Sequence, residues 1–203
     1  MSNLADILRK IPTYSEELGL DLTKEEDRFL WFLASILFAK RISAKIAINT
    51  FKVFVKRGLT TPHRIIEAGW DVLVDVLDEG GYVRYDFSTA SNLLEIMSKL
   101  VNEYGGKVDN IHGKASDYRD LERRLLEFKG VGPVAINIFL RELRGIWIKA
   151  KPKISDKALT VARRIGLKEN IEHYEARLVR IYIEYCKRGR CIICPVAKYC
   201  RMS

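Results

Sequence analysis

Apolar residues recur at helical spacing along almost the whole chain, and this period limits the fold more than any other feature. The run from Phe29 to Phe54 shows it, and so does the set Leu121, Leu125, Leu126 and Phe128. Residues three or four apart lie on one face of a helix, whereas strands alternate apolar and polar residues. The chain has no convincing alternating run. We therefore expect an all-α protein.

Glycine and proline divide the helical pattern into many short helices. The breaks fall at Gly58–Pro62, Gly80-Gly81, Gly105-Gly106, Gly113, Gly130–Pro133, Pro152 and Gly166. No unit repeats at a fixed period, which disfavours a solenoid. With 203 residues, 48% of them hydrophobic, the chain can bury a core as one compact domain or two small lobes.

The chain is basic, with 35 Lys and Arg against 26 Asp and Glu and a formal charge of +9. This balance favours a polyanionic partner, either nucleic acid or an anionic membrane surface, although a merely soluble basic protein is the alternative. No stretch reaches the roughly 18 consecutive apolar residues of a spanning helix, and the N-terminus lacks signal-peptide order, so we expect an intracellular protein that does not span a membrane. Gln is absent, and Lys, Glu, Arg and Ile are abundant, which indicates a thermophilic source.

All four cysteines, Cys186, Cys191, Cys194 and Cys200, fall in the last 18 residues. Two disulfides there would staple only the tail, so the cluster is more typical of a metal site. Successive cysteines are separated by four, two and five residues. Zinc sites usually use two CxxC pairs, and only Cys191 and Cys194 form one. Four cysteines on one short loop favour a 4Fe-4S cluster, with zinc as the alternative.

A glycine turn joins two apolar helices between Leu125 and Leu140. The turn is Gly130-Val131-Gly132, and Pro133 is a favourable first residue for the second helix. This is a helix-hairpin-helix. The glycines allow a tight turn and a close approach to a ligand, and the amides at the start of the second helix can bind a phosphate beside Lys129.

The cysteine loop resembles the C-terminal cluster loop of the endonuclease III and adenine-glycosylase family, within the helix-hairpin-helix (HhH-GPD) DNA glycosylases. The family gaps are usually six, two and five residues, so the first gap here is two shorter. The stretch from Cys191 to Cys200 keeps the family spacing, including the proline after the third cysteine. The resemblance implies that basic residues of the loop face DNA phosphates; these are Lys187, Arg188, Arg190, Lys198 and Arg201.

Asp156 lies at the expected start of a helix downstream of the hairpin. By itself it is an ordinary helix-start carboxylate. The glycosylase family, however, places its essential Asp after the hairpin in a segment of the form P-x-(V/I)-D-x-x-(L/V)-x-R-(V/L), which Pro152, Asp156 and Arg163 or Arg164 fit loosely. The resemblance therefore implies that Asp156 is catalytic, since a carboxylate can stabilise positive charge on the sugar or activate water.

The family members that also cut the strand carry a lysine two residues after the second hairpin glycine, and this chain has Val134 there. Valine cannot form a Schiff base with the sugar. The resemblance thus implies a monofunctional, hydrolytic DNA glycosylase that removes a damaged or mispaired base. A bifunctional enzyme using Lys129, Lys40 or Lys153 is one alternative, although no spacing favours these lysines. A DNA-binding member without catalysis is the other.

Further DNA contacts are implied by the resemblance. In the hairpin they fall on Lys129, Gly130, Val131, Gly132 and Val134. Lys40 takes the place of the family residue that fills the gap left by a flipped base, with a solvated lysine as the alternative. The segment Gly80–Ala90 is similar to the family loop that borders DNA, which gives Tyr82 and Arg84 a stacking ring and a cation, with a tyrosine packed between helices as the alternative.

The resemblance also implies a two-lobed architecture. We expect a barrel of about six helices over residues 26–147, and a second helical lobe formed by residues 1–25 and 148–203 with the iron–sulfur loop. A monomer would bind double-stranded DNA and hold the flipped nucleotide between the lobes. The sequence leaves the identity of the base open.

Overall fold

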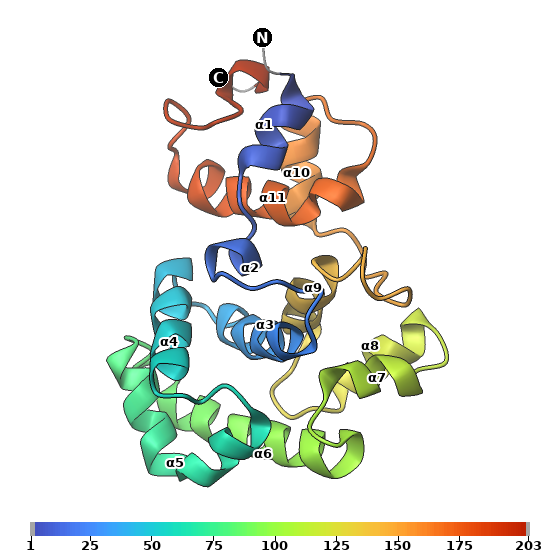
Figure 1. Cartoon of the computed structure of the whole chain (residues 1–203). Helices are drawn as coiled ribbons and strands as arrows, with labels where there is room; N and C mark the ends of the chain where they lie inside the picture. Colours follow the sequence, from blue (N-terminus) through green and yellow to red (C-terminus); the bar gives the residue numbers. More distant parts are fainter. Residues whose placement is uncertain (1–2, 202–203) are drawn as a thin grey trace. The chain divides into compact units, whose positions relative to one another are not determined.

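The computed structural model describes residues 3–201, and within that range the chain contains eleven α-helices, two short 3-10 helices and no strand (Figure 1). The prediction of an all-α protein is confirmed. The chain forms two compact units. The outer unit combines the residues up to Gly19 with those from Pro152 onward, and the central unit spans Leu20–Lys151. The boundaries expected after residues 25 and 147 differ from these by a few residues.

The central unit is built around one buried helix. Its helices are α3 (Glu25–Phe38), α4 (Ala44–Lys56), α5 (Pro62–Glu79), α6 (Asp86–Tyr104), α7 (Val108–Lys114), α8 (Tyr118–Leu126) and α9 (Pro133–Arg141). Every residue of α3 from Trp31 to Leu37 is buried, and α3 packs against α4, α7 and α9. A helix that is apolar on all sides must be surrounded, which places α3 at the centre of the core.

Aromatic rings join α3 to the hairpin of α8 and α9. The Phe32 ring meets the rings of Phe128 and Phe139 edge-on, at centroid distances of 5.8 and 5.2 Å. The Trp31 indole donates a hydrogen bond to the Phe139 carbonyl at 3.2 Å. Edge-to-face ring pairs add to the free energy of burial. The position of the hairpin is therefore fixed by the core of its own unit.

The outer unit has a smaller core of its own. It consists of α1 (Leu4–Lys10), α2 (Tyr14–Glu17), α10 (Asp156–Arg164), α11 (Ile171–Glu184) and two 3-10 helices, η1 (Cys186–Arg188) and η2 (Ala197–Tyr199). Helix α11 packs against α10 and α1. Its apolar face buries Leu178 and Ile181 with Leu8 of α1. The two ends of the chain thus belong to one folding unit.

Side-chain caps begin many of the helices. A polar residue just before the helix accepts a hydrogen bond from an amide of the first turn, which would otherwise lack a partner. These caps are Asn3, Thr13, Ser43, Thr61, Asp117 and Ser155. No helix among the described residues is both long and apolar enough to cross a membrane.

Candidate functional site

The cysteine loop is attached to the outer unit at several points. It leaves α11 through η1, turns at Gly189, and returns through η2. Val196 is buried in the core of the unit, and Cys186 and Cys194 pack against that core. The Arg201 amide donates a hydrogen bond to the Arg164 carbonyl, the last residue of α10, at 2.9 Å. The loop is therefore anchored at both ends and in the middle.

The Cys194 side chain is partly buried where the loop packs against the core of the outer unit. Burial raises the pKa of Cys194, the nearby thiols of Cys186, Cys200 and Cys191 raise it further, and a hydrogen bond from the Val196 amide lowers it. Cys191 is exposed, whereas the other three are partly buried.

The donor set fits an iron–sulfur cluster or zinc. Four thiols from one loop are the usual ligands of a 4Fe-4S cluster, and amide hydrogen bonds to the sulfurs are typical of such sites. Within residues 3–201, however, no group of three or more His, Cys, Asp or Glu side chains is arranged to hold a metal ion. The four thiols are therefore neighbours on a loop and do not form a closed metal site.

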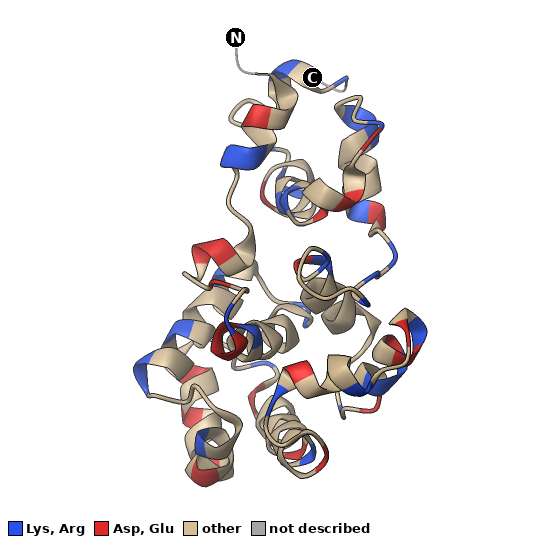
Figure 2. Ribbon diagram, turned by 45° about the vertical axis from the view of Figure 1, so that its right-hand side comes forward, with Lys and Arg blue, Asp and Glu red and all other residues tan. Residues whose placement is uncertain are grey.

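The loop carries several exposed cations, blue near the C-terminus in Figure 2. Lys187 and Arg190 form no ion pair within the described part of the chain, whereas Arg188 pairs with Glu184 of α11 at 3.2 Å. Between these cations and Cys194, Ile192 is 98% exposed. Lys187 and Arg190 can thus contact an anion without breaking an existing ion pair.

The predicted helix-hairpin-helix forms in the central unit. Phe128 and Val131 point into the core, and the Val131 amide donates to the Phe128 carbonyl at 3.0 Å. Val131 has neither its side chain nor its amide available to DNA, so the predicted contact at this residue is wrong for this conformation. Gly130 has a φ of 76°, a left-handed conformation that favours glycine.

The outer edge of the hairpin is accessible. Helix α9 begins at Pro133, and the amide of Val134 in its first turn has no acceptor within the helix. The Val134 side chain is 57% exposed. Lys129 pairs with Glu95 of α6, but an exposed ion pair of this kind contributes little stability and can exchange for a phosphate. One amide and one cation can therefore face an anion here.

Asp156 is the first residue of α10 in the outer unit. It is exposed, and its carboxylate has no hydrogen-bond or ion-pair partner among the described residues. At a rise of about 1.5 Å per residue, it lies about 12 Å along the helix from Arg164, where the cysteine loop is attached. The structure thus places Asp156 and the cysteine loop at opposite ends of one short helix.

A buried carboxylate that was not predicted from the sequence fixes the start of α10. Glu175 of α11 is 0% exposed and accepts a hydrogen bond from the Ser155 amide at 2.9 Å. Ser155 caps α10 by accepting from the Ala158 amide. Burying a carboxylate is costly unless hydrogen bonds stabilise it, so this contact fixes the backbone next to Asp156. A glutamate among the apolar positions of α11 was the signal in the sequence.

The remaining predicted contacts lie in the central unit and differ in accessibility. Tyr82 is 0% exposed, and its hydroxyl donates to the Leu37 carbonyl at 2.9 Å. The prediction that its ring stacks on DNA is therefore wrong, and the alternative of a tyrosine packed between helices holds. Arg84 is exposed, with its guanidinium over the Tyr85 ring. Lys40 is half-buried in the turn after α3.

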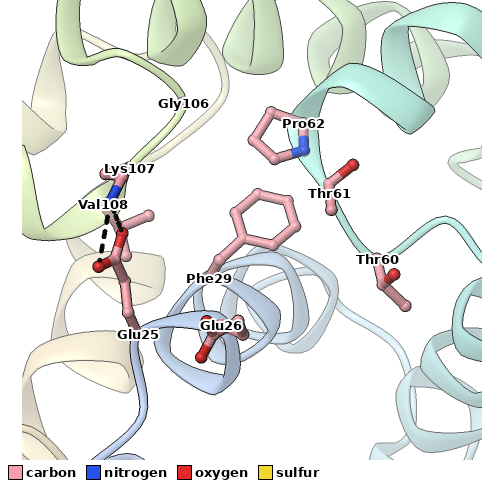
Figure 3. A pocket seen from close by; sticks show the side chains of 9 residues that line it. All are labelled: Glu25, Glu26, Phe29, Thr60, Thr61, Pro62, Gly106, Lys107 and Val108. Atoms are coloured by element: carbon pink, nitrogen blue, oxygen red, sulfur yellow. Dashed lines mark hydrogen bonds and ion pairs between the residues drawn. The ribbon is translucent and has the colours of Figure 1, made fainter.

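A small pocket of about 130 Å³ opens where α3, α5 and α7 begin (Figure 3). Phe29 and Pro62 are part of its lining, and Lys107 pairs with Glu25 at 3.0 Å on one side. A volume of this order suits one small ring. None of the residues predicted to bind DNA lines it.

Replacing Gly130 with Ala is expected to destabilise the protein by about 1–3 kcal/mol, because a Cβ with positive φ is strained. The added Cβ would also lie 2.6 Å from the Asn92 side chain. Urea unfolding of the wild type and the variant measures the difference.

Gly132→Ala is the matched control in the same turn. Its φ is −105° and nothing lies within 4 Å of an added Cβ, so the cost should stay below about 1 kcal/mol. Equal destabilisation by both substitutions would contradict the role given to Gly130.

Comparison with models of protein families gives no match, and comparison with curated proteins gives none either. The likeness to HhH-GPD glycosylases therefore rests on the glycine turn, the spacing of the last three cysteines and the segment around Asp156. A function has to be argued from these local features.

Proposed function

We propose that this chain is a DNA N-glycosylase of base excision repair that uses water to remove a damaged or mispaired base. The observation that carries the proposal is Asp156, an exposed carboxylate without a partner on a backbone fixed by the buried Glu175. A carboxylate at the start of a helix interacts with the helix dipole whether or not its backbone is held by a second helix. Catalytic groups, in contrast, require a fixed position.

The reaction follows from the chemistry of a carboxylate beside a deoxyribose. The bond between C1′ and the base nitrogen breaks, the base leaves with the electron pair, and positive charge develops on the sugar. The Asp156 carboxylate stabilises that charge or accepts a proton from the attacking water, whose oxygen bonds to C1′. The departing base nitrogen takes up a proton, so that the elements of water are divided between the free base and the abasic site.

Two groups of residues support binding to the DNA backbone. The amide of the exposed Val134 suits one phosphate, with Lys129 beside it. The cysteine loop carries three exposed cations that suit further phosphates: Lys187, Arg188 and Arg190. The excess of positive charge over the whole chain agrees with such a partner.

The four cysteines would hold a 4Fe-4S cluster, with zinc as the alternative. Glycosidic hydrolysis transfers no electrons, so the cluster would serve as a rigid cross-link of the loop. Cys186 and Cys194 already pack against the core of the unit. Ligation of all four sulfurs would fix Lys187 and Arg190 relative to that core.

Asp156→Asn is expected to lower the rate of base release by about 100-fold or more, because the neutral amide cannot stabilise positive charge or accept a proton. A panel of duplexes that each carry a single lesion, treated with alkali after the reaction, identifies the substrate and measures the rate. Binding of the same duplex should be preserved.

Glu172→Gln is the matched control, since Glu172 is another exposed acidic residue of the outer unit at the start of a helix. It should leave the rate unchanged. Base release that survives Asp156→Asn would remove Asp156 from the mechanism. A wild-type protein that binds duplex DNA but acts on none of the lesions would indicate the non-catalytic alternative.

Wild-type protein should not be trapped by borohydride on abasic DNA, because Val134 cannot form a Schiff base. The Val134→Lys variant should be trapped, since the new amine would occupy the position that the family uses for this chemistry. The exposure of Val134 makes the substitution tolerable for folding. Efficient trapping of the wild type would instead indicate a bifunctional enzyme.

Protein purified without oxygen is expected to contain four iron and four sulfide per chain, with broad visible absorption. Replacing Cys194 with Ser should abolish the iron and loosen the loop, whereas a Ser88→Ala control in the central unit should not. Zinc in place of iron would establish the alternative metal. A chain free of both metals after reconstitution would contradict the cofactor assignment.

A further inference from the structure

The face formed by α5 and α6 differs from the rest of this basic protein. Between Glu67 and Asp86 the chain carries one cation, Arg84, and six acidic residues: Glu67, Asp71, Asp75, Asp78, Glu79 and Asp86. Trp70 lies within this segment and is 39% exposed. Figure 2 shows the acidic residues of this region in red. A surface opposite in charge to the whole molecule requires its own explanation.

Two aromatic rings form the apolar part of this face. The rings of Trp70 in α5 and Phe87 in α6 lie 5.4 Å apart, and Phe87 is 59% exposed. The Trp70 indole donates to the Ser91 hydroxyl at 3.0 Å, which fixes the orientation of the ring. Large exposed apolar groups held in fixed positions are typical of interaction sites.

A break in α5 starts a new helical segment at Trp70. Gly69 has a φ of 75° and a ψ of 175°, so the helical geometry is interrupted there. After the break, Asp71, Asp75 and Asp78 follow at spacings of four and three residues. They therefore share one face of the helix, with Trp70 at its edge.

The carboxylates of this stripe are not neutralised by the protein. Asp71, Asp75, Asp78 and Asp86 form no ion pair within residues 3–201, whereas Glu79, on another face, pairs with Lys56 and Arg57. Burial raises the pKa of Asp78, and the charge of Asp86 and a hydrogen bond with it raise the pKa further. Negative charge has thus accumulated at this face.

We propose that the surface formed by Trp70, Phe87 and the stripe Asp71, Asp75 and Asp78 docks a positively charged segment of a partner protein that carries apolar side chains. Charge complementarity determines the sign of the partner, and the aromatic pair provides the place for its apolar anchors. DNA does not fit, because its phosphates would meet carboxylates.

The test uses the whole protein and a short synthetic peptide of leucine and lysine in amphipathic helical order. Of the three tryptophans, Trp31 and Trp147 are buried, so a blue shift of tryptophan emission reports on Trp70. The expected result is a saturable blue shift, absent in Trp70→Phe. The matched peptide with glutamate in place of lysine should give none.

Replacing Asp71, Asp75 and Asp78 together with Asn is expected to weaken peptide binding about tenfold, with less dependence on salt. Phe87→Ala should weaken binding as well but preserve the salt dependence, since it removes no charge. Replacing Glu169 and Glu172 of the outer unit with Gln is the control and should change neither quantity. Thermal unfolding checks that all variants remain folded.

Equal binding of the peptide by the triple Asn variant, or binding without a response of Trp70, would overturn the proposal. So would a blue shift caused by an oligonucleotide and lost in Phe87→Ala, because the face would then belong to nucleic acid. Light scattering that shows a dimer lost in Phe87→Ala would assign the face to a second copy and also overturn it. None of these outcomes depends on glycosylase activity.

Discussion

The hydrogen bond from the Ser155 amide to the fully buried Glu175 carboxylate is the contact on which the outer unit's candidate site depends. It joins the start of α10 to α11 and fixes the backbone beside Asp156. A buried carboxylate without hydrogen bonds would be costly, so this contact stabilises the packing of α10 against α11. The same hydrogen bond therefore contributes to the core of this unit and fixes the position of the exposed Asp156.

The sequence predicted those features that local chemistry determines. The apolar period indicated helices, Pro133 marked the start of α9, and a glycine was needed at Gly130, which has a positive φ. It did not predict the burial of Tyr82, because a tyrosine in a glycine-rich loop suits a core and a surface equally well. Nor did it predict the role of Glu175, which depends on a partner twenty residues away in the sequence. Tertiary contacts of this kind leave no periodic pattern.

The cysteine loop illustrates the same division between local and tertiary information. The spacing of its cysteines indicated that the four thiols serve one metal site, and this stays a prediction. The anchoring of the loop could not be predicted, since it uses the buried Val196 and the Arg201 amide bound to the end of α10. These contacts determine which cations of the loop face solvent.

Helix α10 is only nine residues long, yet each of its ends is held by another part of the chain. Isolated helices of this length are marginal in water and normally fray from their termini. Here fraying at the first turn must break the contact with Glu175, and fraying at the last turn must release the Arg201 amide. The hydrogen-bonded amides of α10 are therefore protected from exchange with solvent at both ends of the helix as well as in its middle.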